Sequence, residues 1–539
     1  MLKQDLSFKT LCENADLTVA QAAVRLEIND EELQQLLGGR AVPISIQNAL
    51  RVEAMFPEAK RPSLTPPYRE LGNLSCVSLF SGAGGLDIGL EQAGFHTLFA
   101  NELEKYACET LRQNKALNEV SISNFDNWFE ETVAPQRCYG KARPSDMKLL
   151  SDRLKQGVKL NFRHLLNTTI SENDVRDISA DQILSVTRTN RGEIHLMAGG
   201  PPCQPFSRAG KRETVECEKG QLFMEFVRLV DGVRPRWFLF ENVKGLVLHN
   251  AEIATRKCSN CGREEALEFQ LREQLRNEGN INLQCSECLV VGEHRIGWHN
   301  QRGGSLDIIR AEFERLGYRC YDKVLNAADF GAPQSRERIF IVGSRDNEPF
   351  QWPAATHSDP RLLDPAVRDF FDRSERRLPW TTARQALFQD GHWRYGNLDD
   401  QNAVLWVKNV VRPHDEPVTW SLDRIAPTVG AHQSAKLAVA PYGVPDEQLF
   451  RQQWHVLGRR QGDTKPVFVE HEYLTDTELL RLQTFPTSWY LHGTRMERAF
   501  QIGNAVPPVL AKAVGEAILA ACGSSTIKKG EKIGYASSI

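Results

Sequence analysis

The 539-residue chain lacks several features that define other classes of protein. No apolar run approaches the roughly 20 residues of a membrane-spanning helix, and the N-terminus has no apolar signal-peptide core. No internal repeat is found, and neither sign of charge is in excess, because 66 Lys and Arg face 69 Asp and Glu. These absences exclude membrane, secreted, collagen-like, coiled-coil and disordered proteins. We therefore expect a cytoplasmic protein of several globular modules.

The formal net charge of −3 argues weakly against a protein that coats nucleic acid, but it leaves room for local basic surfaces. Residues 1–60 hold six Lys or Arg and nine Asp or Glu, so this segment alone contributes 6 − 9 = −3. The rest of the chain is formally neutral.

The 12 cysteines do not form a disulfide framework, since the chain is expected to be intracellular. Four of them form two Cys-x-x-Cys pairs separated by 23 residues, namely Cys258, Cys261, Cys285 and Cys288. Two such pairs supply the four soft ligands of a tetrahedral zinc site, although a chance set of buried cysteines has the same composition. His294 or His299 is an alternative to one of the four ligands.

Short apolar runs alternate with helical patterns along residues 75–345, which predicts an α/β fold with a mostly parallel, doubly wound sheet. A predicted helix covers Leu86–Ala93 and ends at Gly94. The predicted strands are Ser75–Phe80, Thr97–Ala100, Ile194–Ala198, Trp237–Phe240 and Arg338–Gly343.

A glycine-rich turn, Phe80–Gly85, lies between the first predicted strand and its helix. Glu102 follows the second predicted strand, where a carboxylate can accept hydrogen bonds from ribose hydroxyls. Asp87 occupies the position at which a dinucleotide site needs a third glycine, and it would repel a pyrophosphate. The turn therefore suits a nucleoside cofactor without phosphates, such as S-adenosylmethionine, better than NAD; a plain tight turn is the alternative.

Cys203 lies in a proline- and glycine-rich loop that follows the strand ending at Ala198. Arg208, Lys211 and Arg212 come shortly afterwards with no carboxylate among them, and nearby cations favour the nucleophilic thiolate. A lone cysteine is more often a small core residue, but a stiff loop of this kind favours a reactive thiol.

Two further segments place charged groups at strand ends. Glu241 follows the strand Trp237–Phe240, and a carboxyl group in an apolar setting has a raised pKa and can donate a proton. Arg336 and Arg338 are two residues apart at the start of another strand, which predicts that they share one face.

These segments, in this order, resemble the motifs of the DNA cytosine-5 methyltransferase family. The resemblance covers roughly residues 75–345 and 470–522. It is carried by Phe80–Gly85, Pro202–Gln204, Glu241–Val243, Gln334–Arg338, Leu482–Pro486 and Gly503–Pro507.

The resemblance implies a mechanism. Cys203 attacks C6 of a cytosine that is flipped out of double-stranded DNA, and Glu241 protonates N3. Arg338, with Arg336, contacts the base, and C5 then takes a methyl group from S-adenosylmethionine. The implied cofactor-binding residues are Phe80, Gly82, Gly85, Glu102, Asp177, Ile178, Pro202, Leu222, Asn504 and Ala505.

The resemblance also implies a Rossmann-like catalytic domain and a smaller, irregular target-recognition domain, beside an all-helical N-terminal unit. The predicted divisions are a helical unit at 1–60, a proline-rich linker at 61–74, the catalytic domain at 75–349 with a zinc-binding insertion at 249–304, the target-recognition domain at 350–469, a return to the catalytic domain at 470–522, and a tail at 523–539.

The N-terminal unit resembles an Xre-type helix-turn-helix over Leu17–Phe56. Its expected recognition helix begins Asn29-Asp-Glu-Glu32, with three carboxylates where phosphate contacts are expected. We therefore favour docking over DNA reading for this unit.

Two alternatives differ from a DNA methyltransferase. One branch of the family methylates tRNA, but its Cys-Phe-Thr signature is absent here. A non-catalytic DNA-binding regulator is disfavoured because Cys203, Glu241 and Arg338 are all intact. The expected enzyme is a nucleoid-associated monomer that acts alone or beside a restriction endonuclease without forming a stable complex.

Overall fold

The computed structural model describes most of the chain after residue 73. The described residues are 74–135, 144–160, 163–202, 222–267, 283–285, 287–292, 294–362, 377–388, 403–409, 417–431, 433–441 and 468–524, with isolated residues elsewhere. The contacts within the chain divide it into two compact units, Met1–Pro67 and Tyr68–Ile539. The predicted helix-turn-helix and Cys203 both lie outside the described residues.

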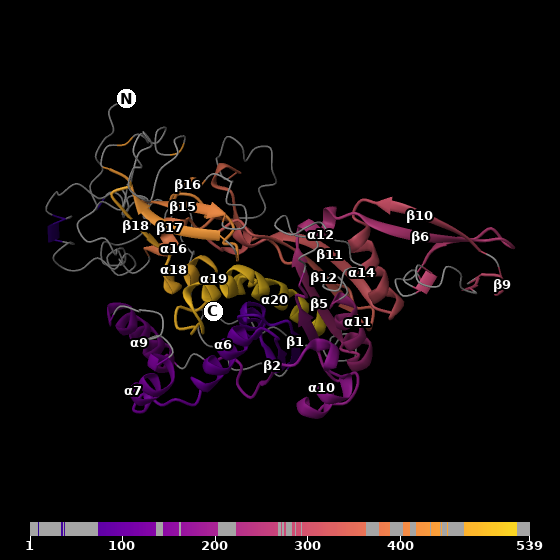
Figure 1. The fold of residues 1–539 in the computed structure, drawn as a ribbon, viewed down its shortest axis with the longest axis horizontal. Helices are drawn as coiled ribbons and strands as arrows, with labels where there is room; N and C mark the ends of the chain where they lie inside the picture. The colour runs from indigo at the N-terminus through magenta and orange to yellow at the C-terminus, as the bar shows by residue number, and fades with distance from the viewer. Residues whose placement is uncertain are drawn as a thin grey trace. The chain divides into compact units, whose positions relative to one another are not determined.

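A seven-stranded sheet with the order β11-β12-β5-β4-β1-β2-β3 forms the centre of the second unit (Figure 1). Its strands are β1 (Leu74–Leu79), β2 (Phe95–Asn101), β3 (Thr169–Ser171), β4 (Leu196–Gly199), β5 (Trp237–Val243), β11 (Arg319–Asn326) and β12 (Glu337–Ser344). Strands β1 to β5 run parallel to one another, whereas β12 is antiparallel to both β5 and β11. The five predicted strands are confirmed, and the sheet is mixed.

Both faces of this sheet are buried, because alternate residues of its apolar strands point to opposite sides. Val77 and Phe238 belong to a core cluster on one face, and Cys76 and Trp237 belong to a cluster on the other. The first face is covered by α10 (Ala180–Thr187), α11 (Leu222–Val233) and α14 (Gly304–Arg315), and the second by α5 (Gly85–Ala93) and α20 (Pro508–Ser524). The sheet is therefore doubly wound.

The segment Arg495–Cys522 is long and apolar enough to cross a membrane by composition alone, but 61% of its apolar window is buried. Within it, α20 packs against α5 so closely that a Cβ at Gly89 would overlap Ala511 and the carbonyl oxygen of Pro508. This segment is thus the core helix of the catalytic fold.

The second unit also contains smaller helices. They are α6 (Lys105–Ala116), α7 (Phe125–Trp128), a π-helical turn (Phe129–Val133), α9 (Pro144–Lys159), α12 (Gly245–Leu248), α16 (Ala383–Leu387), α18 (Asp476–Leu482) and α19 (Arg495–Asn504), with 3-10 turns at Val175–Asp177, Ala327–Phe330 and Pro360–Leu362.

The region predicted to be irregular contains a second sheet, with the order β16-β15-β17-β18 and all pairs antiparallel. Its strands are β15 (Ala403–Asn409), β16 (Val418–Ser421), β17 (Gln433–Val439) and β18 (Glu470–Tyr473), and a short pair, β13 (His357–Ser358) and β14 (Leu378–Pro379), precedes it. Leu405 and Leu437 belong to a core cluster with Leu479 and Leu480 of α18, which attaches this sheet to the catalytic part.

An arm is inserted between α12 and α14. It consists of β6 (Ala251–Cys258), β7 (Glu264–Ala266), β8 (Leu283–Gln284), β9 (Val291–Gly292) and β10 (His294–Gln301). β6 and β10 form an antiparallel ladder of eight pairs and run out beyond α14, with β9 at the far end (Figure 1).

Candidate functional site

The carboxyl ends of the parallel strands meet at one edge of the central sheet. Leu79 is in register with Asn101 and with Gly199, and Gly199 is in register with Phe240. The next residues along the chain are therefore brought to this edge, and the antiparallel β12 begins there. Ligand sites of open α/β sheets form at such edges.

The glycine-rich turn adopts backbone angles that few other residues tolerate. Gly82 has φ 56° and Gly84 has φ 87°, and Phe80 also has a positive φ of 56°. A Cβ at Gly85 would overlap the carbonyl oxygen of Val506, so this glycine permits close contact with the Gly503–Pro507 segment. The turn and the C-terminal segment thus form one wall.

Glu102 is held against this turn. Its Oε2 accepts a hydrogen bond of 2.7 Å from the Gly82 backbone N–H, and its Oε1 accepts one of 2.8 Å from Glu104. Burial raises the pKa of Glu102, and the backbone N–H groups oppose that rise. Nothing lies within 4 Å of a Cβ placed on Gly82, so there is open space in front of the turn. This arrangement fits a nucleoside whose hydroxyls bind the Glu102 carboxylate.

Asp87 does not face that space, because it is fully buried and accepts a 3.5 Å hydrogen bond from Ser81. Burial raises the pKa of Asp87 to about 7. The Asp87 carboxylate would therefore not contact a pyrophosphate in that space. It could repel one only through the long-range charge of a buried group.

The remaining predicted cofactor residues differ in exposure. Ala505 is buried, with its Cβ 3.1 Å from a Cβ placed on Gly85, and Ile178 lies in the core cluster beside β1. Leu222, the first residue of α11, is half-buried. The exposed members are Asp177, Pro202 and Asn504.

Glu241 and Arg338 form a buried ion pair at the same edge. Arg338 Nε lies 2.9 Å from Glu241 Oε1, and the two side chains are 12% and 10% exposed. Burial raises the pKa of Glu241, while the positive charges of Arg338 and Arg336 oppose the rise. A Cβ at Gly200 would lie 2.6 Å from the second carboxylate oxygen, so a side chain there would displace the carboxyl group. The pair can donate a proton and stabilise negative charge on a polar ring.

Arg336 binds backbone groups, whereas Arg338 pairs with Glu241. Arg336 immediately precedes β12, which begins at Glu337. It is fully buried, and it donates from Nη1 to the carbonyl oxygen of Val429 (2.9 Å) and from Nη2 to that of Gly503 (2.7 Å). Its guanidinium joins two backbone segments, and its positive charge also opposes the rise in the pKa of Glu241.

Two buried glutamines extend this connection, and sequence reasoning did not single them out. Gln334 donates to the carbonyl oxygen of Leu482 (2.7 Å) and accepts from the backbone N–H of Val429 (3.0 Å). Gln483 donates to the carbonyl oxygens of Ile502 (2.7 Å) and Ala505 (2.9 Å). Their only sequence signal is that both lie within the family motifs.

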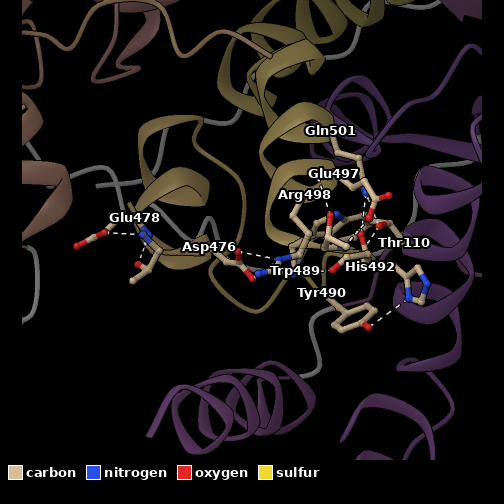
Figure 2. Close-up of polar contacts among 12 residues, drawn as sticks. Thr110, Asp476, Glu478, Trp489, Tyr490, His492, Glu497, Arg498 and Gln501 are labelled. Atoms are coloured by element: carbon tan, nitrogen blue, oxygen red, sulfur yellow. Dashed lines mark hydrogen bonds and ion pairs between the residues drawn. The ribbon is translucent and has the colours of Figure 1, made fainter. Parts of the chain in front are cut away.

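A polar network joins α6 to α19, as Figure 2 shows. Thr110 donates to Gln501 (2.7 Å) and accepts from the backbone N–H of His492 (2.9 Å), and Gln501 donates to the carbonyl oxygen of His492 (2.8 Å). Because α6 begins just after Glu102 and α19 ends at Asn504, the network fixes two parts of the cofactor wall together.

The four predicted metal ligands gather at the end of the arm. The sulfur atoms of Cys258, Cys261, Cys285 and Cys288 all lie within 4.8 Å of one another. Cys258 and Cys288 are 3.7 Å apart and Cys261 and Cys285 are 3.5 Å apart, close to the roughly 3.8 Å edge of a zinc–thiolate tetrahedron. The four sulfurs suffice without His294, and the side chain of His299 lies outside the described residues.

Comparison with known proteins decides the family. The family described as C-5 cytosine-specific DNA methylase matches residues 74–134, 156–263 and 298–520. The chain belongs to this family. It is therefore a DNA cytosine-5 methyltransferase whose methyl donor is S-adenosylmethionine and whose substrate is DNA.

Individual relatives of this cytosine-5 methyltransferase are bacterial. It is 28% identical to the Type II methyltransferase M1.HphI of Haemophilus parahaemolyticus over 83% of this chain and 87% of that protein. It is 31% identical to the Type II methyltransferase M.AquIA of Picosynechococcus over 52% of this chain and 76% of that protein. Among solved structures, S. pombe Dnmt2 methyltransferase is 14% identical, with a TM-score of 0.44 over 84% of this chain and 99% of that one.

Proposed function

We propose that this enzyme methylates the cytosine of one short DNA sequence through a covalent intermediate on Cys203. The Cys203 thiolate adds to C6 of a flipped-out cytosine, and Glu241 gives its proton to N3, so that the electron pair reaches C5. S-adenosylmethionine, when bound, supplies an electrophilic methyl group to C5. The C5 proton then leaves to a base, and Cys203 departs from C6 as 5-methylcytosine forms.

The buried pair of Glu241 and Arg338 carries this proposal. The raised pKa of Glu241 keeps a proton available for N3, and Arg338 lies 2.9 Å away to hold the carboxyl group in position. Pro202, the last described residue before Cys203, follows Pro201, whose carbonyl oxygen accepts a hydrogen bond from Asn242 (3.4 Å). The loop that carries Cys203 thus starts beside the acid.

The cofactor site is assigned to the wall formed by the glycine-rich turn and the C-terminal segment. Glu102, held by the Gly82 N–H, accepts hydrogen bonds from the ribose hydroxyls. The remaining assigned residues are Phe80, Gly85, Asp177, Ile178, Pro202, Leu222, Asn504 and Ala505.

Target recognition is assigned to residues 350–469, with the second sheet as its framework. At the edge of this sheet Tyr473 is flanked by two cations, with Lys436 Nζ 4.7 Å and the Arg495 guanidinium 3.7 Å from its ring centre. Lys436 is buried, so the exposed Arg495, which follows the assigned range in sequence, is the cation of this pair that supports contact between this side of the enzyme and DNA.

Two accessory modules complete the proposal. A structural zinc ion bound by Cys258, Cys261, Cys285 and Cys288 is supported by the spacing of their sulfurs. The N-terminal helix-turn-helix unit is assigned a docking role, so deleting residues 1–60 is expected to leave methyl transfer intact.

The cellular role is assigned from the Type II relatives. We infer that the enzyme protects DNA in a restriction–modification system without a stable complex with its endonuclease. It works as a monomer at the nucleoid.

Substitution of Cys203 tests the mechanism. Wild-type enzyme, tritiated S-adenosylmethionine and either DNA or tRNA are combined, with Cys203→Ser assayed beside the wild type. We expect label in DNA alone and none with Cys203→Ser, although this variant still binds the cofactor. DNA with 5-fluorocytosine should trap the wild type covalently, because fluorine cannot leave C5 as a cation. Full activity of Cys203→Ser would rule out the mechanism, and label in tRNA would change the substrate.

A further inference from the structure

The arm formed by residues 251–301 begins only eight residues after Val243, close to the carboxyl end of β5 that carries Glu241. Its base is fixed, because a Cβ on Gly304 at the start of α14 would lie 3.1 Å from the carbonyl oxygen of Ala251. Eight residues of extended strand span about 26 Å, which equals roughly seven or eight base pairs of DNA. The arm, which starts near the active-site edge, is therefore long enough to lie along several base pairs of a DNA duplex.

The two faces of the β6–β10 ladder differ in character. Residues Ala254 and Ile296 lie in a small apolar cluster with Leu267 and Leu275. Because side chains alternate along a strand, Cys258 lies on this covered face, and Lys257 lies on the opposite one. The opposite face also carries Thr255, Arg295 and Gly297.

Lys257 and Arg295 are directly opposite each other in the ladder, and both are exposed. Like charges in cross-strand positions destabilise a hairpin unless an anion lies nearby. Lys257 is also in register with Glu264 of β7 on its other side, but among the residues that the structure describes no carboxylate lies within ion-pair distance of Lys257 or Arg295. Arg263 at the end of the arm, by contrast, pairs with Glu287 at 3.2 Å. Their position on the face opposite Cys258 also separates them from the thiolates.

The next pair on the same face is Thr255 and Gly297, whose side chains are small. Gly297 is exposed, and a Cβ there would come within 3.3 Å of Thr255 Oγ1. An antiparallel ribbon with a pair of exposed cations beside small residues is complementary to the phosphates of a duplex, and β-ribbons are an established shape for DNA contact.

We propose that this face of the arm binds the DNA backbone beside the methylated site, with Lys257 and Arg295 as its phosphate contacts. The proposal rests on the proposed methylation of DNA and adds a second contact region, separate from target recognition. Phosphate contacts of this kind raise affinity for every sequence without selecting one. The arm thus gives the enzyme a grip on flanking DNA although its net charge is near zero.

The test compares two duplexes that contain the same recognition site. One has about 20 flanking base pairs on each side and the other about three. We expect the double variant Lys257→Ala/Arg295→Ala to raise KM for the long duplex at least tenfold with kcat unchanged, and to leave KM for the short duplex unchanged. The salt dependence of binding to the long duplex should weaken by about two phosphate contacts, a slope change of roughly 1.8.

The matched control is Lys148→Ala/Lys159→Ala, which removes two exposed lysines from α9 and should leave both KM values unchanged. Zinc content and thermal unfolding confirm that the arm variant is folded, and Lys257→Glu/Arg295→Glu should enlarge the effect. Equal KM values for variant and wild type on the long duplex would overturn the proposal, as would an equal loss on both duplexes. Failure of the proposed function is distinguishable, since the wild type would then label neither duplex.

Discussion

A Cβ placed on Gly200 lies only 2.6 Å from Oε2 of Glu241, so the loop backbone and the catalytic acid are in contact. A methyl group at residue 200 would push the carboxyl group away from Arg338 and away from N3 of the target. We expect Gly200→Ala to lower kcat at least tenfold, because proton donation contributes about 100-fold or more to such reactions. Single-turnover methyl transfer measures the effect.

Cofactor binding provides the control for Gly200→Ala, since Glu102 and the glycine-rich turn are on other strands. The dissociation constant of S-adenosylmethionine should change less than twofold. Unchanged kcat in a folded Gly200→Ala protein would show that the position of Glu241 does not limit the reaction.

Asp87 links stability to pH. Burial raises the pKa of Asp87 to about 7 in the folded protein, above its value of about 4 in the unfolded chain. The stability that this group contributes is therefore fully present below about pH 4 and is lost as the pH rises toward 7. We expect Asp87→Asn to raise the free energy of unfolding at pH 8 by at most about 4 kcal/mol. Urea unfolding of the variant and the wild type measures this difference.

The same comparison at pH 5.5 should show a smaller gain for Asp87→Asn. A gain that is equal at both pH values would mean that the ionisation of Asp87 does not cause it.

How much of the site was predictable depends on the range of its contacts. Glu241 could be placed at the sheet edge because it follows a short apolar strand, but its contact with Arg338, at the start of β12, depends on the antiparallel direction of that strand. The partners of Arg336 and Gln334 could not be predicted, since Val429 and Leu482 lie 93 and 148 residues away. Such contacts depend on tertiary packing that has no local pattern.

The fold shows the same division. Short apolar runs predicted β1 and β4 to within two residues at each end. The second sheet was missed because its strands mix Trp406 and Lys436 with small residues, which hides the alternation. The antiparallel direction of β12 was also missed, because strand direction is set by the connections that precede it.

Removal of the metal is expected to unfold the arm alone. The four sulfurs close the far end of the β6–β10 ladder, whose only described apolar cluster is the small group around Ala254. A chelator should release about one zinc per chain, and amide exchange in β6 and β10 should then become fast while exchange in the central sheet stays slow. Cys258→Ser/Cys285→Ser should reproduce this pattern. Purified protein with no bound zinc, or with a stable arm after chelation, would contradict it.

Arg336 is expected to be a positioning residue, so its loss should change DNA binding as well as the free energy of unfolding. Its guanidinium holds Val429, on the recognition side, against Gly503, beside the cofactor wall. It does so through two separate nitrogens in a fixed fork, which the single nitrogen of a lysine lacks. We expect Arg336→Lys to lower the free energy of unfolding by about 2–4 kcal/mol, because two buried acceptors lose a charged donor. KM for DNA should rise at least tenfold, and discrimination against near-cognate sites should fall. KM for S-adenosylmethionine should change little, because Gln483 still holds Ile502 and Ala505.

Arg384→Lys, at an ion pair with the exposed Asp423, is the matched control and should lower the free energy of unfolding by less than about 1 kcal/mol. Direct contact of Arg336 with the base would instead lower kcat on every site equally, and that result would reject the positioning role.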